Sequence, residues 1–286
     1  MAFDPNTIPD SLKQAYKDKR CAIFVGAGAS MGAGLPGWES FLSSMISAAE
    51  THRTIDDTKA TEYRSLLKDQ SKYLMIAESL KHDMAMYFDD FLERKFKPSG
   101  ISPTDLHKSI TKATNFQFVI TTNYDTLIER TYRSMGLDDV SVNIFSDTGE
   151  IQRSLSKREF FILKAHGDIS RMGNGIILTE NDYRTIIYKE RGYQSLLSAM
   201  FTMFSIVFVG ASMTDPDVKL LLSYISDIFS VTSGPSHFAL LDEKKITQVE
   251  KERWLRDMRI QIIPISAEND YSELTEFVDA LHLTSV

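Results

Sequence analysis

The chain has 286 residues, of which 43% are hydrophobic and 25% charged, the composition of a globular protein. Its formal net charge of −7 excludes the overall basic character typical of nucleic-acid-binding proteins. The single cysteine, Cys21, excludes an intramolecular disulfide and a zinc cluster built from cysteines. No apolar run is long enough to cross a membrane and the first residues carry no signal-peptide pattern, so we expect a cytoplasmic protein.

Short apolar runs that indicate β-strands recur from Cys21 to Ile265. Amphipathic helix patterns separate most of the later runs, and this alternation favours a parallel sheet covered on both faces. We therefore predict an α/β fold, Rossmann-like and doubly wound around a mainly parallel sheet, with residues 1–286 as a single domain. The predicted strands are 22–25, 116–122, 140–145, 160–166, 205–210, 237–241 and 259–265. The predicted helices among them are 124–135, 215–229, 246–258 and 270–283.

The stretch between the first helix after Trp38 and the second strand has a different pattern. Apolar residues such as Tyr63, Leu74 and Leu80 recur there at helical spacing, and no run suggests a strand. We expect residues 51–112 to form a helical insertion within the domain.

The first strand runs into a turn of small residues, Gly26, Ala27, Gly28, Ala29 and Ser30. A turn of this kind lets a backbone approach a phosphate closely. The third glycine of the dinucleotide-binding motif is missing, and no acidic residue soon ends a second strand, as a dehydrogenase would require. The turn could therefore be either a phosphate-binding site or only a tight connection between the strand and the next helix.

Two further strand ends carry polar side chains. The second strand ends at Thr121 and Thr122, and Asn123 leads into a helix with Asp125 in its first turn. Asn123 could equally be a helix cap, because Asn is among the best capping residues. His166 ends another strand and is followed by Gly167. A lone histidine at such a position is as well explained by a hydrogen bond at the edge of the core.

A fourth strand ends in a second small-residue turn that contains Gly210 and Ser212. These two residues could offer an N–H group and a hydroxyl to a ribose or phosphate, while Asp215 and Pro216 are ordinary helix-start residues. Because parallel strands share one rim at their carboxyl ends, we expect the four motifs to meet at one crevice.

In their order and spacing, these motifs resemble the sirtuin superfamily. The pattern of that family, a GAG-x-S turn, a G-[IL]-P segment, a T-x-N-x-D strand end, a His-Gly pair and a G-x-S turn, is matched here by residues 26–30, 34–36, 121–125, 166–167 and 210–212. The resemblance implies NAD as substrate, with its pyrophosphate on the first turn and its nicotinamide ribose between Asn123 and His166. The residues it implies for NAD binding are Gly26, Ala27, Gly28, Ala29, Ser30, Gly34, Trp38, Thr122, Gly210 and Ser212.

The departures from the family pattern distinguish this chain from the sirtuins that deacylate proteins. Protein-deacylating sirtuins carry a four-cysteine zinc ribbon, which this chain cannot build, so we expect no metal. Their Asp-Phe-Arg segment is replaced by Gly37, Trp38 and Glu39. The chain looks similar to the zinc-less bacterial sirtuin-like NADases of antiphage defence. It resembles their short members, which work beside a partner that is often a HerA-type ATPase.

The resemblance implies hydrolysis of NAD to nicotinamide and ADP-ribose, or a cyclic form of it. Asn123 would position a water through its carboxamide, and His166 would act as general base. Asp125 would orient the loop or stabilise the ribosyl cation, although it could equally interact with the dipole at the start of its helix. The alternatives are an NAD- or ADP-ribose-binding module that gates a partner ATPase and, less in keeping with the single cysteine, a deacylase. We also expect a homo-oligomer and no direct nucleic-acid binding.

Overall fold

The computed structural model describes residues 3–213, 222 and 235–284. Their seven strands form one sheet in the order β3-β4-β2-β1-β5-β6-β7, and every neighbouring pair is parallel. The strands are β1 (Cys21–Val25), β2 (Phe116–Thr121), β3 (Ser141–Ile144), β4 (Phe161–Lys164), β5 (Ser205–Val209), β6 (His237–Asp242) and β7 (Ile260–Ile265).

Helices cover both faces of the sheet, because apolar side chains alternate between the faces along each strand. On β1, Ile23 and Val25 join one buried cluster while Ala22 and Phe24 join the other. The first cluster is closed by α1 (Asp10–Lys17), α7 (Asp105–Lys112), α8 (Leu127–Ser134) and α14 (Glu268–Leu283), the second by α9 (Thr148–Lys157), α11 (Arg191–Met203) and α13 (Gln248–Met258). The prediction of a Rossmann-like, doubly wound α/β fold is confirmed.

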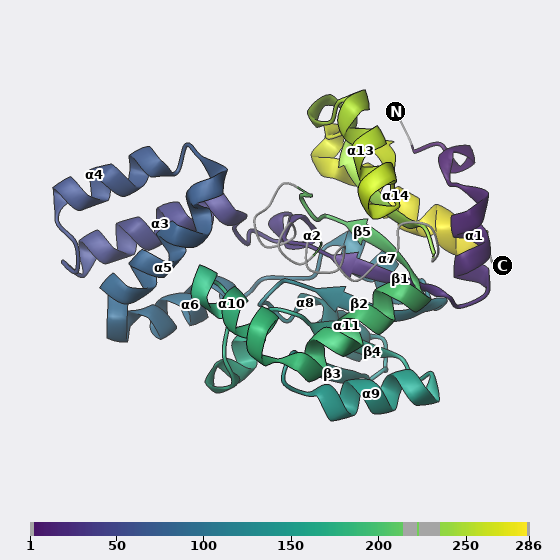
Figure 1. Ribbon diagram of the computed structural model, residues 1–286, viewed down its shortest axis with the longest axis horizontal. Helices are drawn as coiled ribbons and strands as arrows, with labels where there is room; N and C mark the ends of the chain where they lie inside the picture. The colour runs from purple at the N-terminus through teal and green to yellow at the C-terminus, as the bar shows by residue number, and fades with distance from the viewer. Residues whose placement is uncertain (1–2, 214–221, 223–234, 285–286) are drawn as a thin grey trace.

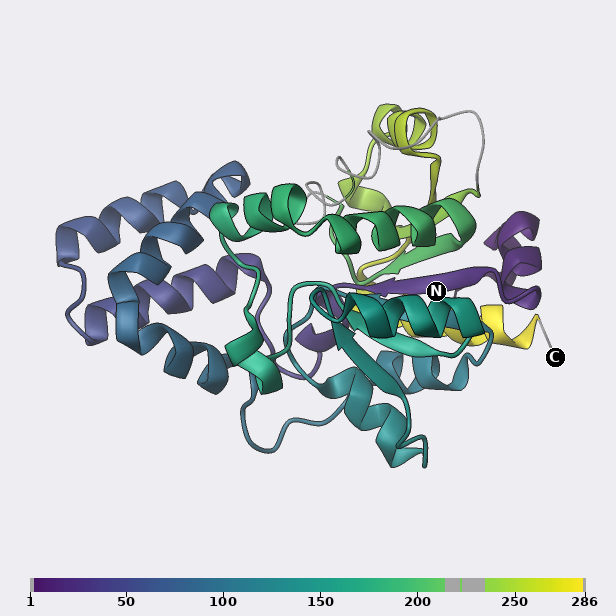
Figure 2. The same ribbon diagram turned by 60° about the horizontal axis from the view of Figure 1, so that its bottom comes forward.

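A group of helices stands apart from these layers, at the end of the molecule opposite both chain termini (Figures 1 and 2). They share a core of their own, which includes Phe41, Met45, Leu80 and Phe96. The group consists of α3 (Trp38–Thr51), α4 (Asp57–Leu66), α5 (Tyr73–Met84) and α6 (Phe88–Phe96).

The bounds of this group differ from the predicted insertion at 51–112. Its core begins within α3, and α7 packs on the sheet through Leu106 and Ile110. The apolar face of α7 explains the difference, since it is buried in the cluster on one face of the sheet, beside α8 and α14, and not among the helices of the insertion. The helix predicted at 215–229 lies outside the described residues, apart from Leu222.

The strand order places four motifs on four adjacent strands, β4-β2-β1-β5. Val25 is paired with Thr121 on one side and Val209 on the other, and Thr121 is paired with Lys164. The strands therefore end nearly level. Strands β2 to β4 lie on one side of β1, and strands β5 to β7 lie on its other side. The strand order therefore switches between β1 and β5, and ligands bind at such a switch point in open α/β sheets.

The turns after β1 and β5 are packed against each other. The N–H of Gly28 donates to the carbonyl of Gly210 at 2.8 Å, and a Cβ added to Gly26 would lie 2.5 Å from the Cα of Ala211. Gly210 has a φ of +62°, which favours glycine. Close approach of two backbones thus accounts for these glycines without any phosphate.

We expect Gly28→Ala to lower the free energy of unfolding by about 1–3 kcal/mol, because its Cβ would lie 2.7 Å from the Gly210 carbonyl oxygen. The matched control is Gly149→Ala in α9, where an added Cβ meets no described atom within 4 Å. This control should leave stability unchanged or raise it by up to ~1 kcal/mol. Urea unfolding measures both values, and equal losses would contradict the packing argument.

Candidate active site

A pocket with about 500 Å³ of empty space, part of it open to solvent, lies at the carboxyl ends of β1, β2 and β4. One wall is apolar and contains Trp38 and Phe41 from α3 together with Phe96 from α6. The opposite wall is polar and comes from the ends of the strands. The remaining lining residues are Ala27, Ser30, Leu35, Pro36, Gly37, Thr122, Asn123, Tyr124, Asp125, His166 and Leu178.

Asn123 is 8% exposed and is held by three hydrogen bonds. Its backbone N–H donates to the Thr121 hydroxyl at 3.1 Å, and its side-chain NH2 donates to the Gly26 carbonyl and the Ser30 hydroxyl, both at 3.1 Å. The NH2 is therefore engaged within the protein, and no described residue donates to the carbonyl oxygen. That oxygen is the part of the carboxamide available to a water or ligand.

His166 lines the same pocket and is 4% exposed. Burial lowers the pKa of its imidazole to about 3, so the ring is neutral at pH 7. The hydroxyl of Tyr183 lies 3.1 Å from Nε2, and the two rings meet edge to face. Gly167 follows with a φ of +92°, and a Cβ there would lie 2.5 Å from the Gly175 carbonyl oxygen. The glycine thus permits the sharp turn that follows His166.

Asp125 is 4% exposed and has a structural contact as well as a place in the pocket wall. Its Oδ1 accepts a hydrogen bond at 2.9 Å from the N–H of Leu127, the first residue of α8. This bond satisfies one of the N–H groups left free at a helix start. The N-cap residue of α8 is Thr126, and the side chain that accepts from the helix start is that of Asp125, not that of Asn123.

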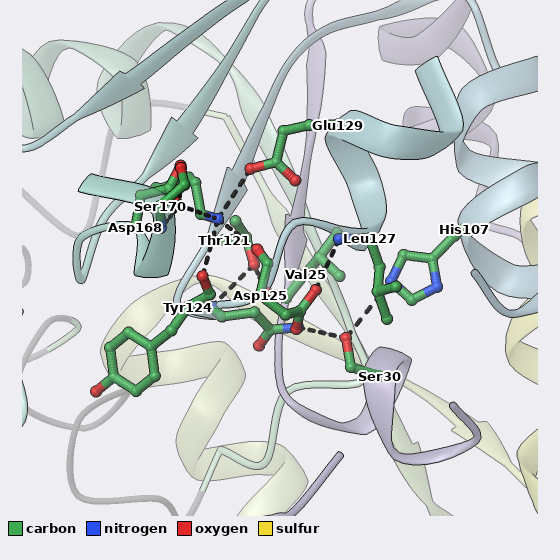
Figure 3. A network of polar contacts seen from close by, with 12 residues as sticks. Val25, Ser30, His107, Thr121, Tyr124, Asp125, Leu127, Glu129, Asp168 and Ser170 are labelled. Atoms are coloured by element: carbon green, nitrogen blue, oxygen red, sulfur yellow. Dashed lines mark hydrogen bonds and ion pairs between the residues drawn. The ribbon is translucent and has the colours of Figure 1, made fainter. Parts of the chain in front are cut away.

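A buried lysine, Lys164, joins the loop after β2 to the loop after β4. Its partners Tyr124, Asp125, Glu129 and Asp168 are labelled in Figure 3. The ammonium of Lys164 donates to the carbonyls of Tyr124, at 3.1 Å, and of Asp125. It lies 2.9 Å from a carboxylate oxygen of Glu129 and 3.4 Å from one of Asp168. Because one cation contacts both loops, it sets the position of Asp125 relative to the turn after His166.

The pocket brings together seven of the residues expected at the site and leaves the others elsewhere. It is lined by the three expected catalytic residues and by Ala27, Ser30, Trp38 and Thr122. Gly26, Gly28, Ala29, Gly34, Gly210 and Ser212 are outside its lining.

The backbone of the turn after β1 is largely occupied by contacts within the protein. The N–H groups of Gly26, Gly28, Ala29 and Ser30 all donate to carbonyl oxygens of the protein. Only that of Ala27 has no acceptor among the described residues. A pyrophosphate bound to this turn in its present shape would therefore find one free N–H group, and the expected contact remains a prediction.

Sequence analysis did not identify several residues that build the site. Phe96 lies far from the motifs along the chain, and no local pattern marks it as a pocket wall. The sequence does contain a signal for Lys164, because this charged residue lies inside an apolar run, two positions before His166. His107 is a further buried residue, 1% exposed, and its Nε2 lies 3.5 Å from the Ser30 hydroxyl.

Neither a metal centre nor a membrane span is found in the described part of the chain. No group of three or more His, Cys, Asp or Glu side chains there could hold a metal ion. None of the described helices combines the length and hydropathy of a membrane-spanning segment. Cys21 is buried, and burial raises the pKa of its thiol.

These features define a Rossmann-like α/β domain whose pocket lies at the strand ends beside the switch point. Residues 117–263 match the family described as SIR2-like domain, and the chain belongs to that family. The resemblance to the sirtuin superfamily is thus confirmed.

Curated relatives are named as an NAD(+) hydrolase and as a defense-associated sirtuin. The chain is 24% identical to the NAD(+) hydrolase ThsA of Bacillus cereus (strain MSX-D12), over 96% of this chain and 56% of that protein. It is 27% identical to the defense-associated sirtuin 2 of Bacillus subtilis, over 77% of this chain and 21% of that protein. The chain spans little more than half the length of the ThsA relative. A solved Sir2 enzyme structure aligns with 96% of this chain and 98% of its own, at 13% identity and a TM-score of 0.47.

Proposed function

We propose that this protein is an NAD⁺ hydrolase that cleaves the bond between nicotinamide and ribose and depletes NAD in antiphage defence. The observation that carries the proposal is that Asn123 and His166, 43 positions apart in the sequence, line one pocket with an aromatic wall. The family match and the names of the curated relatives support the same reaction.

The pocket has the groups that this reaction needs. NAD and water give nicotinamide, ADP-ribose and a proton. Nicotinamide leaves with the electron pair of the glycosidic bond and becomes neutral, so its departure requires no acid. The transition state has oxocarbenium character at the ribose. The Asp125 carboxylate in the pocket wall would stabilise that positive charge, and Trp38 with Phe41 would contact the nicotinamide ring.

Asn123 and His166 would act on the water that attacks the ribose. The carbonyl oxygen of Asn123 accepts a hydrogen bond from the water, because its NH2 is already engaged with Gly26 and Ser30. The neutral imidazole of His166 accepts the proton. An imidazole with a lowered pKa is a weak base, and a weak base suffices when the electrophile is a cation.

The test is release of nicotinamide from NAD, followed by chromatography. We expect Asn123→Ala and His166→Ala each to lower the rate by ~10²-fold or more, in the range of lost general-base catalysis. Asn6→Ala and His82→Ala are matched controls at exposed positions and should retain the rate. Thermal melting establishes that each variant is folded. A wild-type protein that never cleaves NAD, or site variants as active as the controls, would refute the proposal.

A regulatory NAD-binding module is the second candidate. Calorimetry that detects tight NAD binding without nicotinamide release would support it. An acetyl-lysine peptide assay tests the deacylase alternative.

We also propose that assembly controls the activity, because unregulated loss of NAD would harm the cell that makes the enzyme. The assembly would be a homo-oligomer or a complex with a HerA-type ATPase, in the cytoplasm. The NAD assay is therefore run with and without that ATPase, and light scattering measures the mass of the protein alone. A monomer whose activity does not respond to the ATPase would refute this control.

A further inference from the structure

Helix α7 begins with a capping box in which the usual glutamate or glutamine is replaced by a histidine. Thr104 is the N-cap residue and His107 the third helical residue. The backbone N–H of Thr104 donates to Nδ1 of His107 at 3.2 Å. Glutamate or glutamine normally accepts this hydrogen bond. The imidazole satisfies the cap equally well and leaves a second ring nitrogen for another partner.

That second nitrogen lies against Ser30, which lines the pocket. Nδ1 accepts from the backbone N–H of Thr104, and the Thr104 hydroxyl lies 2.7 Å from the same nitrogen, so the proton of the neutral ring is on Nε2. Nε2 lies 3.5 Å from the Ser30 hydroxyl, so this contact is a long hydrogen bond donated to Ser30 (Figure 3). His107 is 1% exposed and Ser30 is 2% exposed, so water does not compete for the contact.

The Ser30 hydroxyl connects His107 to Asn123. Its oxygen accepts from the Asn123 NH2 at 3.1 Å as well as from His107, and both lone pairs are then occupied. A reversed carboxamide would place its oxygen against the Gly26 carbonyl and lose both donated bonds. Thr104 also holds the ring, since its hydroxyl is closer to Nδ1 of His107, at 2.7 Å, than to the Ala29 carbonyl, at 3.1 Å, and donates its one proton to the nitrogen.

We propose that His107 is a positioning residue that fixes the orientation of the Asn123 carboxamide through the Ser30 hydroxyl. The inference rests on the proposed function, in which Asn123 directs a water at the ribose. It explains why a histidine stands at a position where glutamate would cap the helix: both oxygens of a glutamate accept hydrogen bonds, and neither could donate to Ser30.

Three variants separate positioning from helix capping. His107→Met removes both nitrogens at similar volume. His107→Gln keeps an acceptor for Thr104 and a donor for Ser30. Thr247→Val removes the hydroxyl of the N-cap residue of α13, which lies outside the pocket lining, so it controls for the stability lost with a helix cap.

We expect His107→Met to lower kcat for NAD cleavage by ~10–100-fold, the scale of a misplaced catalytic group, with KM changed by less than ~3-fold. His107→Gln and Thr247→Val should both keep kcat within ~3-fold of the wild type, and the thermal shift of Thr247→Val measures the effect of losing a helix cap alone. Equal kcat losses in His107→Met and Thr247→Val, or no recovery in His107→Gln, would overturn the proposal.

A readout independent of activity keeps this test apart from that of the proposed function. Nitrogen NMR should place the His107 proton on Nε2, and the Asn123 NH2 protons should exchange more slowly in the wild type and His107→Gln than in His107→Met. A proton on Nδ1, or equal exchange in all three proteins, would overturn the inference even if the wild type cleaves NAD. A wild type that lacks activity but has the expected NMR signals would refute only the proposed function.

Discussion

Replacing Lys164 by Met is expected to lower the free energy of unfolding by about 3–5 kcal/mol, the usual cost of removing one partner of a buried ion pair. Lys164 is fully buried, and its ammonium is 2.9 Å from Glu129 and 3.4 Å from Asp168. Without the cation, two buried carboxylates and two backbone carbonyls lose their common partner. Urea unfolding at pH 7 measures the loss.

The double variant Lys164→Met with Glu129→Gln should recover part of that stability. Burial raises the pKa of Glu129, and Lys164 opposes the rise. Without Lys164, nothing offsets the cost of desolvating this carboxylate, and a neutral glutamine avoids that cost. The exposed pair of Lys97 and Glu93, 3.2 Å apart, supplies the control. Lys97→Met should cost no more than about 1 kcal/mol. Comparable losses for Lys97→Met and Lys164→Met would contradict a structural role for the buried lysine.

Lowering the pH from 7 to 5 is expected to remove about 5 kcal/mol of stability through three buried histidines. Burial lowers the pKa of His107 and of His237 to about 4 and that of His166 to about 3, against 6.5 for an exposed histidine. Below pH 6.5 the unfolded chain therefore binds protons that the folded protein does not. Each histidine then costs about 1.4 kcal/mol per pH unit until the folded-state pKa is reached.

The variant His237→Asn isolates one of these contributions. Nδ1 of His237 accepts a hydrogen bond from the N–H of Ile206 at 3.2 Å, and an asparagine oxygen can replace that acceptor without titrating. The difference in stability between pH 7 and pH 5 should shrink by about 2 kcal/mol relative to the wild type. His82→Asn, at an exposed position, should leave the difference unchanged. An unaltered pH dependence in His237→Asn would show that this histidine is not protonated on unfolding.

Local patterns were sufficient to predict the architecture and much of the pocket. Short apolar runs identified all seven strands of the described residues, because burial on both faces of a parallel sheet demands such runs. The motifs at the ends of β1, β2 and β4 identified Ser30, Asn123 and His166 as candidates, and all three line the pocket.

The same patterns missed several helices. The sequence analysis assigned no elements to α9, α10 (Glu180–Lys189) or α11. It also treated α7 as part of the insertion, although that helix packs on the sheet. A helical periodicity identifies an apolar face but not the surface that covers it, and the choice between sheet and neighbouring helices is made only by packing.

The sequence by itself determined the parallel α/β fold, the family and the strand ends at which polar groups gather, because these depend on residues close together in the chain. Only the tertiary structure decided which contacts those residues make. It paired the glycines of one turn with those of another, buried Lys164 between two loops and placed His107 behind Ser30. Such contacts join residues tens of positions apart, and their energies come from burial and geometry that no short sequence pattern records.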